Sequence, residues 1–227
     1  LGLSTIVGST WQQVVQKRTL LKATQYSNEA LMESISAGSS IAYTSNRFTE
    51  YRYASLFGRV TLDHDSKYLL NASFRRDGSS RFGPGQRFGN FGALGAAWIF
   101  SAEPAVQKHL PLLSFGKLRG SYGIVGNDQV PDYGYLSTYG TNNLYGGIST
   151  LSPARLANRD YSWESTRKWE AALELGFWNS RLLTTFAWYR NRSGNQLVDY
   201  PLPSQSGFTT YQANLPAVVQ NKGWEFT

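Results

Sequence analysis

Few residues of this chain have the types and spacing that catalysis needs. Its 227 residues include two histidines and no cysteine. His64 falls in an expected tight turn and His109 near an expected helix end, so both are expected to be solvated. Glu170 and Glu174 share one side of an expected strand. Four strand residues separate them by about 13–14 Å, beyond the ~5–9.5 Å of a glycosidase pair. We predict that the chain is not an enzyme, with no catalytic, cofactor-binding or metal-binding residue.

Two other groups of residues have chemistry suited to binding. Four arginines lie near an expected loop tip, where guanidinium groups can pair with phosphates; they are Arg75, Arg76, Arg81 and Arg87. Aromatic residues of expected loops could stack on sugar faces; they are Tyr133, Tyr135, Tyr139, Tyr145, Trp163 and Tyr211. Simpler alternatives stay open: the arginines keep a loop soluble, and the rings pack their own loops or a covering protein.

The arginines belong to the clearest structural pattern, residues 68–100. Tyr68, Leu70 and Phe74 alternate with neighbours on the other side, as in a strand with one apolar face. Turn residues follow, and residues 90–100 alternate again. The stretch predicts a hairpin with a polar, arginine-rich tip.

This pattern recurs along the chain. Strands are expected over residues 3–15, 51–62, 117–125, 164–178 and 181–196, with a further one starting at 223. Tight turns are expected at 63–67 and 179–180, and long connections over 17–50, 126–163 and 197–222. A short helix is expected over 27–37, and a helical turn or two after Pro104.

Loop lengths and composition select among all-β architectures. Long structureless loops are uncommon in compact soluble domains, whereas outer-membrane barrels have short turns at one end and long loops at the other. Aromatic residues make up 15% of the chain, and amphipathic rings suit a border between apolar and wet surroundings. No apolar run is long enough for a spanning helix. The pattern predicts antiparallel up-and-down strands of a large transmembrane β-barrel with long extracellular loops.

A barrel assigns roles to individual residues. The expected aromatic girdle is Tyr68, Trp98, Trp169, Phe177, Trp178 and Trp188. Trp188 and Tyr189 must point to opposite faces, and which of them meets lipid stays open. Glu170 and Glu174 are expected to line a wet lumen, partly neutralised by Lys168. The four arginines are expected at the outer rim, beside phosphates of anionic outer-leaflet lipid.

The formal net charge of +7 does not predict a nucleic-acid partner. The excess comes from 22 Lys and Arg against 15 Asp and Glu. These basic residues form neither a stripe nor a compact block with interleaved aromatics.

Several motifs, in order along the chain, resemble one known family. They are Ser55-Leu56-Phe57-Gly58-Arg59-Val60, Arg76-Asp77-Gly78-Ser79-Ser80-Arg81-Phe82-Gly83, Lys117-Leu118-Arg119-Gly120-Ser121-Tyr122-Gly123, Trp163-Glu164-Ser165-Thr166 and Asn221-Lys222-Gly223-Trp224-Glu225. They resemble the barrel of SusC/RagA-type TonB-dependent outer-membrane transporters.

The resemblance implies that residues 1–227 are a partial barrel domain with about eight of about 22 strands, lacking the plug domain and the barrel ends. It implies active import of glycans or peptides across a Gram-negative outer membrane. A SusD-like surface lipoprotein would act as the lid, and a TonB-type protein would supply energy through a missing N-terminal part. No cofactor is implied.

One alternative of another class stays open. A soluble or surface β-sheet module that binds glycans, such as a sandwich, would also show alternating strands. The two differ in burial, because a sandwich covers its apolar faces with a second layer.

Overall fold

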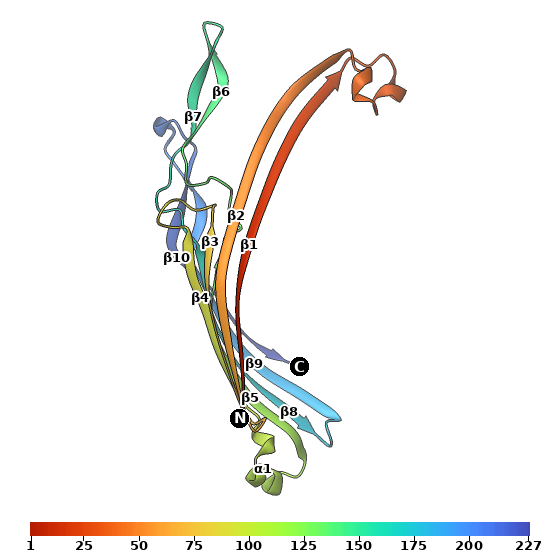
Figure 1. Ribbon diagram of the computed structural model, residues 1–227, viewed down its shortest axis with the longest axis vertical. Coiled ribbons are helices and arrows are strands. Elements are labelled where there is room, and N and C mark those ends of the chain that lie inside the picture. Colours follow the sequence, from red (N-terminus) through yellow and green to blue (C-terminus); the bar gives the residue numbers. More distant parts are fainter. The chain divides into compact units, whose positions relative to one another are not determined.

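In the computed structural model, eight strands of the described backbone form one sheet and two more form a separate hairpin (Figure 1). The structure describes the backbone of residues 1–227 and the side chains of residues 1–141 and 145–227. The order in the sheet is β1-β2-β3-β4-β5-β8-β9-β10. The strands are β1 (Gly2–Thr24), β2 (Ser40–His64), β3 (Tyr68–Ser79), β4 (Phe88–Trp98), β5 (Leu113–Asn127), β8 (Glu164–Phe177), β9 (Leu182–Pro201) and β10 (Thr210–Phe226). The hairpin consists of β6 (Thr138–Tyr145) and β7 (Ile148–Arg155). The predicted all-β, antiparallel, up-and-down fold is confirmed.

The chain divides into two compact units. Residues 1–11 and 53–227 form the first unit, and residues 12–52 form the second. In the second unit, the connection from β1 to β2 contains two 3-10 helices, η1 (Glu29–Leu31) and η2 (Ile35–Ala37). The Asn28 side chain caps η1 by accepting a hydrogen bond from the Ala30 amide at 3.0 Å.

The predicted connection over residues 17–50, with one helix inside it, is wrong in extent. β1 runs on to Thr24 and β2 already starts at Ser40. Ile41, Tyr43 and Phe48 are β-branched or aromatic residues that favour strands. The polar residues between them concealed this preference.

The predicted hairpin over residues 68–100 is confirmed by the antiparallel pairing of β3 with β4. The tight turn before β3 lies at Asp65 and Ser66, whose φ angles are 54° and 55°. Positive φ at both central residues is the conformation of a type I′ turn, which suits the twist of a hairpin. The Asp63 carboxylate accepts a hydrogen bond from the Ser66 amide at 2.7 Å, so a side chain near the end of β2 stabilises the turn.

Two of the predicted long connections contain more strand than expected. Between β9 and β10 only residues 202–209 are a connection, with the 3-10 helix η4 (Ser204–Ser206). The β9–β10 ladder shifts register between Leu215 and Val218, beside Pro216. Proline has no backbone N–H to donate a ladder hydrogen bond, and the bulge beside it interrupts the alternation of side chains. The sequence pattern therefore did not reveal β10. Within residues 126–163, β6 and β7 meet at Gly146 and Gly147, which both have positive φ.

Two short helices connect β4 to β5, as the sequence predicted. They are η3 (Phe100–Ala102) and α1 (Pro104–His109). Glu103 between them accepts hydrogen bonds from the Tyr68 hydroxyl at 2.8 Å and the Trp98 indole at 3.4 Å. The bond from Tyr68 is the main cause that lowers the pKa of the Glu103 carboxyl. No helix in the described part of the chain is long and apolar enough to cross a membrane.

The ladder register sorts the side chains of the first unit onto two different faces, because successive strand residues point to opposite sides. The apolar face carries Leu62, Tyr68, Leu70, Phe74, Leu94, Trp98, Leu118, Tyr122, Trp169, Leu173, Phe186, Trp188, Trp224 and Phe226. The polar face carries Arg59, Asn71, Ser73, Arg75, Asp77, Lys117, Arg119, Ser121, Lys168, Glu170, Glu174, Tyr189, Asn191, Asn221 and Glu225. Trp188 therefore lies with the apolar side chains and Tyr189 with the polar ones.

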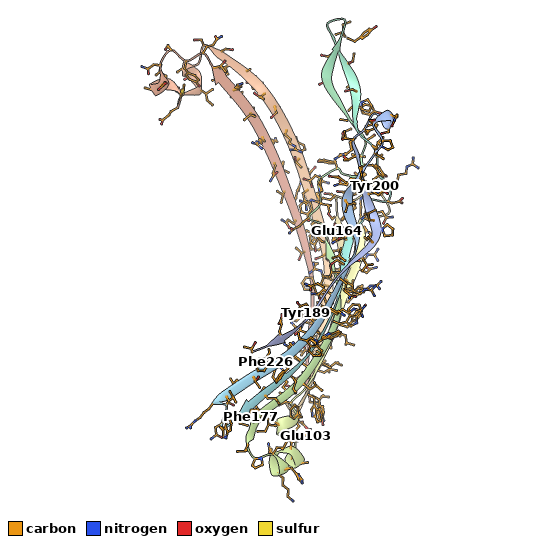
Figure 2. The ribbon with its side chains drawn as sticks, turned by 180° about the vertical axis from the view of Figure 1, so that it is seen from behind. Glu103, Glu164, Phe177, Tyr189, Tyr200 and Phe226 are labelled. Carbon is orange, nitrogen blue, oxygen red and sulfur yellow. The ribbon has the colours of Figure 1, made fainter. Side chains whose placement is uncertain are left out.

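The apolar face is not buried by the rest of the described chain. Leu118 is 49% exposed and Trp224 82% exposed. In a sandwich these side chains would be covered by a second layer. Figure 2 shows the sheet with its side chains, with Glu164 and Phe177 at the two ends of β8.

Candidate functional site

The polar face is held together by ion pairs between β5 and β8. Arg119 pairs with Ala172 in the ladder and so stands between Glu170 and Glu174. Its Nε donates to Glu174 Oε1 at 2.8 Å, and its Nη1 donates to Glu170 Oε1. Lys117 Nζ lies 3.7 Å from Glu174 Oε2. One guanidinium on β5 thus pairs with two carboxylates of the neighbouring strand β8.

This arrangement changes one sequence prediction. Lys168 was the expected neutralising partner of the two carboxylates, but the ion pairs found among the described residues come from Arg119 and Lys117. Lys168 points to the same face from the middle of β8 and is exposed. Cross-strand neighbours, which the sequence does not reveal before register is known, determine the partners.

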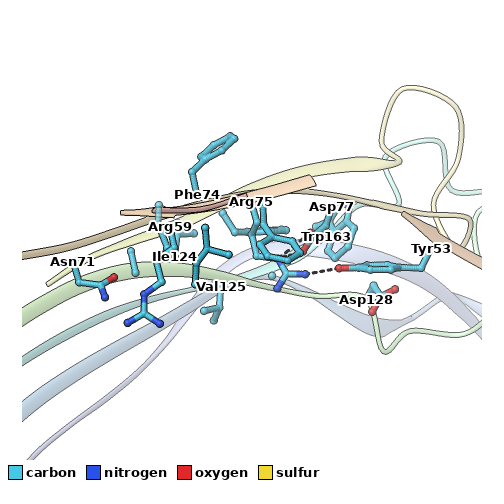
Figure 3. A pocket seen from close by; sticks show the side chains of 18 residues that line it. Tyr53, Arg59, Asn71, Phe74, Arg75, Asp77, Ile124, Val125, Asp128 and Trp163 are labelled. Carbon is cyan, nitrogen blue, oxygen red and sulfur yellow. Dashed lines mark hydrogen bonds and ion pairs between the residues drawn. The ribbon is translucent and has the colours of Figure 1, made fainter. Parts of the chain in front are cut away.

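A hollow of about 680 Å³ lies against the polar face (Figure 3). Its walls combine hydrogen-bonding side chains with aromatic rings: Tyr53, Arg59, Asn71, Ser73, Arg75, Asp77, Phe91 and Trp163. Arg75 Nε donates to both carboxylate oxygens of Asp77 at 2.9 and 2.8 Å, and its Nη2 donates to the Tyr53 hydroxyl at 2.6 Å. Phe74, the preceding residue, points away from these side chains in Figure 3.

A second hollow, of about 540 Å³, lies along β5, β8, β9 and β10. Lys168, Glu170, Tyr189, Asn191 and Asn221 contribute to its walls. Both hollows therefore present charges, amides and rings together. Such surfaces can hydrogen-bond and stack on polar molecules.

The connections that follow β3, β5 and β7 share a small buried core. Phe82, Val130 and Tyr161 form it, and Phe82 and Tyr161 are fully buried. The Phe82 ring lies 6.0 Å from that of Tyr161 and 4.9 Å from that of Trp163, measured between ring centroids. Loops that follow β3, β5 and β7 therefore pack on one another.

Tyr161 also contributes a polar contact to this core. Its hydroxyl donates a hydrogen bond to the carbonyl of Pro131 at 3.4 Å. Burial raises the pKa of the Tyr161 phenol to about 12. Burial has this effect because it disfavours the charged phenolate.

The six aromatic residues predicted to contact a substrate or lid do not gather around one cavity in the described structure. Trp163 lines the 680 Å³ hollow, and its indole donates to the carbonyl of Arg87 at 3.1 Å. Tyr135 packs on the loop core, and the Tyr211 hydroxyl donates to the carbonyl of Ala157 at 3.4 Å.

The other three lie elsewhere in the loops. Tyr139 and Tyr145 are 62% and 83% exposed on the β6–β7 hairpin. Tyr133 is half-buried, and its carbonyl accepts a hydrogen bond from Arg155 at 2.6 Å. Contact of these six residues with a substrate or a lid stays a prediction.

The four arginines predicted to form an anionic-lipid rim also occupy different surroundings. Arg75 lies on the polar face, and Arg76 lies on the opposite face, 5.2 Å above the Phe88 ring. Arg81 is tied to the loops, since its Nε donates to Asp132 at 2.9 Å and its Nη1 donates to a backbone carbonyl. Arg87 is exposed at the end of the β3–β4 connection. Lipid binding by these four residues stays a prediction.

The histidines and carboxylates of the described residues form no group of three or more that could hold a metal ion. His64 Nε2 lies 3.7 Å from an Asp65 oxygen in an exposed turn. His109 Nδ1 lies 2.8 Å from the carbonyl of Ala105 at the end of α1.

Comparisons with known proteins identify the family. The model of the TonB dependent receptor-like β-barrel matches residues 2–227. The chain belongs to this family. It is 36% identical over 177 residues to TonB-dependent receptor P39 of Formosa agariphila, covering 78% of this chain and 17% of that protein. It is 31% identical over 186 residues to TonB-dependent receptor SusC of Bacteroides thetaiotaomicron, covering 79% and 18%.

Solved structures agree with this assignment. The structure of the RagAB peptide transporter superposes with a TM-score of 0.85 at 27% identity, covering 99% of this chain and 25% of that one. The resemblance to SusC and RagA is thereby confirmed. This TonB-dependent receptor chain spans about a fifth of the length of the curated relatives that it matches.

Sequence reasoning missed several residues that organise the site of this TonB-dependent receptor chain. Arg119, Tyr53 and Asp77 were not singled out, although each is a polar residue at an alternating strand position that faces away from the apolar side. Phe82 and Tyr161 were missed because loop residues carry no periodicity that marks burial. Alternation could have found the first three, whereas the loop core required the three-dimensional structure.

Proposed function

We propose that the chain forms part of the wall of an outer-membrane active transporter that imports oligosaccharides or peptides. A TonB-type protein would supply the energy, and a SusD-like surface lipoprotein would cover the outer opening. In this proposal the apolar face meets lipid hydrocarbon, and the polar face meets the water-filled interior through which cargo passes.

The two-faced sheet is the observation that carries the proposal. Its apolar side chains stay exposed, as Leu118 and Trp224 illustrate, while Arg119 and its carboxylates lie on the other side. Lipid hydrocarbon would cover the apolar side chains of the first face, and water would solvate the second face. Family membership and the likeness to a structure described as a peptide transporter support the same conclusion.

The polar hollows favour cargo rich in hydrogen-bonding groups. The 680 Å³ hollow offers guanidinium, amide and carboxylate groups beside the rings of Tyr53 and Trp163. Sugars and peptide backbones both use such donors, acceptors and stacking surfaces. The walls therefore suit either of the two cargo classes.

Uptake by cells tests the proposal. Cells that contain the complete transporter are given labelled oligosaccharide or peptide mixtures, and uptake is compared after deletion of the transporter, the TonB-type protein or the lipoprotein. We expect deletion of the transporter or of the TonB-type protein to abolish uptake, and loss of the lipoprotein to reduce it strongly. Unchanged uptake in all three deletions, or recovery of the protein in the soluble fraction, would overturn the proposal and favour a glycan-binding module.

A further inference from the structure

Four cationic side chains lie together on the apolar face of β8, β9 and β10. Arg167 on β8 pairs directly with Arg192 on β9, and Arg190 on β9 pairs directly with Lys222 on β10. Directly opposed residues in antiparallel strands have Cβ atoms about 4.5–5.5 Å apart. We call these four residues the basic cluster.

The cluster contains two like-charge pairs, which destabilise a sheet when nothing compensates them. No ion pair found among the described residues includes any member of the cluster. The acids of β8 and β10, which are Glu164, Glu170, Glu174 and Glu225, all lie on the polar side by register. The β9 acid, Asp199, lies seven residues along the strand from Arg192. Such a concentration of uncompensated positive charge is expected to attract an anion from outside the chain.

The contacts that the cluster does make leave its charge unneutralised. Arg190 Nε donates to the neutral Gln220 side chain at 2.9 Å, and its Cζ lies 5.8 Å from the Trp169 ring centroid. These contacts orient the guanidinium across β8, β9 and β10. Guanidinium groups held in this way can form paired hydrogen bonds with phosphate oxygens.

The position of the cluster along the strands points to a lipid phosphate. Arg167 lies ten residue steps before Phe177 on β8, and the residues on the apolar face between them include Trp169 and Leu173. Ten residues extend about 33 Å along a strand, which at a tilt of about 40° is about 25 Å in height, the height of the apolar band of an outer-membrane barrel. The cluster thus lies one apolar-band height above Phe177.

The orientation of β8 indicates in which leaflet of the membrane the anion would lie. Arg167 lies near the end of β8 that joins residues 128–163, the longest connection in the described chain. Long loops mark the extracellular end of an outer-membrane barrel. The anion beside the cluster would therefore belong to the outer leaflet.

We propose that the basic cluster binds the phosphate groups of an anionic lipid of the outer leaflet, whose acyl chains lie along Phe186, Trp188 and Trp224. This inference rests on the proposed function, because it requires the apolar face to meet lipid. The four residues of the basic cluster lie on three adjacent strands. They differ from the four arginines that the sequence predicted to bind lipid.

Lipid binding by the complete, detergent-purified transporter tests the site. The probes are bisphosphorylated lipid A, the same lipid without its phosphates, and inorganic phosphate as a competitor. The test variant is the double substitution Arg167→Gln and Arg192→Gln. The control is Arg59→Gln and Lys168→Gln, which removes the same charge from the polar face.

We expect the test variant to bind bisphosphorylated lipid A about tenfold or more weakly. The control should bind as the unchanged protein does, and the lipid without phosphates should bind weakly to all forms. Equal binding by test variant and unchanged protein, or equal losses in test and control, would overturn the inference. Displacement of the lipid by millimolar inorganic phosphate would also overturn it, since the site would then recognise free phosphate.

A labelling experiment separates failure of this inference from failure of the proposed function. These 227 residues have no cysteine, so Leu118→Cys and Ser121→Cys place thiols on the two faces of β5 in a transporter from which any cysteine outside these residues has been removed. A charged, water-soluble thiol reagent should label Ser121→Cys and spare Leu118→Cys, because it reacts with a solvated thiolate and does not enter hydrocarbon. This labelling pattern together with unchanged lipid binding by the test variant removes only the basic-cluster site, whereas equally fast labelling of both thiols removes the proposed function as well.

Discussion

At the scale of single residues, the polar face depends on one guanidinium that serves two carboxylates. Arg119→Ala would leave Glu170 and Glu174 on one strand face, with Lys117 as the ion-pair partner that remains among the described residues. Because these side chains are partly exposed, solvent screening limits the cost, and we expect the free energy of unfolding to fall by about 1 kcal/mol. Urea denaturation of the complete transporter measures it.

Arg59→Ala is the matched control for this prediction. Arg59 is an exposed arginine on the same face, and none of the ion pairs found among the described residues includes it. Its removal should change the free energy of unfolding by less than about 0.5 kcal/mol. Equal effects of the two substitutions would show that the ion pairs of Arg119 contribute nothing measurable.

Tyr161 gives the loop core a dependence on pH. Its folded pKa of about 12 lies above the ordinary phenol value, so folding stabilises the protonated form. The resulting stability is fully present below pH 10 and is lost as pH rises through 12. We expect the loops around Phe82 to become accessible to protease over this range in the unchanged protein.

Tyr161→Phe tests the cause of this pH dependence. The variant keeps the ring but removes the ionisable hydroxyl, and the hydrogen bond that it loses is long at 3.4 Å. Its loops should therefore resist protease near neutral pH as the unchanged protein does and stay closed to higher pH. Identical protease profiles from pH 10 to 12 would assign the opening to other tyrosines.

At the scale of elements, the turn between β2 and β3 places two non-glycine residues in an unfavourable backbone conformation. Asp65 and Ser66 both adopt left-handed φ angles, which residues with a Cβ atom occupy at a cost. Ser66→Gly removes this cost while keeping the backbone amide that Asp63 accepts from. We expect the free energy of unfolding to rise by about 0.5 kcal/mol.

Ser66→Ala is the control for this change, because it removes the hydroxyl and keeps the Cβ atom. It should leave the free energy of unfolding within about 0.3 kcal/mol of the original. If the alanine variant gained as much as the glycine variant, backbone conformation would not be the cause.

The strands that the sequence predicted well are those with one apolar face and one polar face. Period-two alternation located β3, β4, β5 and β8 because their apolar residues stand on one side only. Where both faces are polar, as in much of β2 and at the start of β10, alternation gives no signal although backbone pairing continues. Pro216 adds a bulge that interrupts the pattern of β10.

Sites that depend on several elements were harder to predict than the elements themselves. The pairing of Arg119 with two carboxylates, and of Arg167 with Arg192, follows from the ladder register between strands. A single sequence does not fix this register. The loop core has the same origin, since Phe82, Val130 and Tyr161 come from three separate connections.

At the scale of the whole molecule, the described sheet has β1 and β10 as its edge strands. Edge strands present unpaired backbone groups and promote aggregation. In the proposed barrel, other strands of the wall would pair with both edges. The polarity of the two faces then determines where a new charge can be tolerated.

Leu118→Arg and Ser121→Arg test this rule on one strand. Leu118 pairs with Trp98 and Leu173 on the apolar face, whereas Ser121 is exposed on the polar face. If the apolar face meets hydrocarbon, Leu118→Arg should cost about 2–4 kcal/mol near the bilayer midplane. We expect a marked loss of folded transporter in the outer membrane, measured by heat-modifiable migration on electrophoresis. Ser121→Arg adds the same charge to the face that would meet the water-filled interior, so the amount of folded transporter should stay near normal. Equal losses in the two variants would mean that both faces of β5 lie in the same environment. A wall that spans a membrane does not allow this.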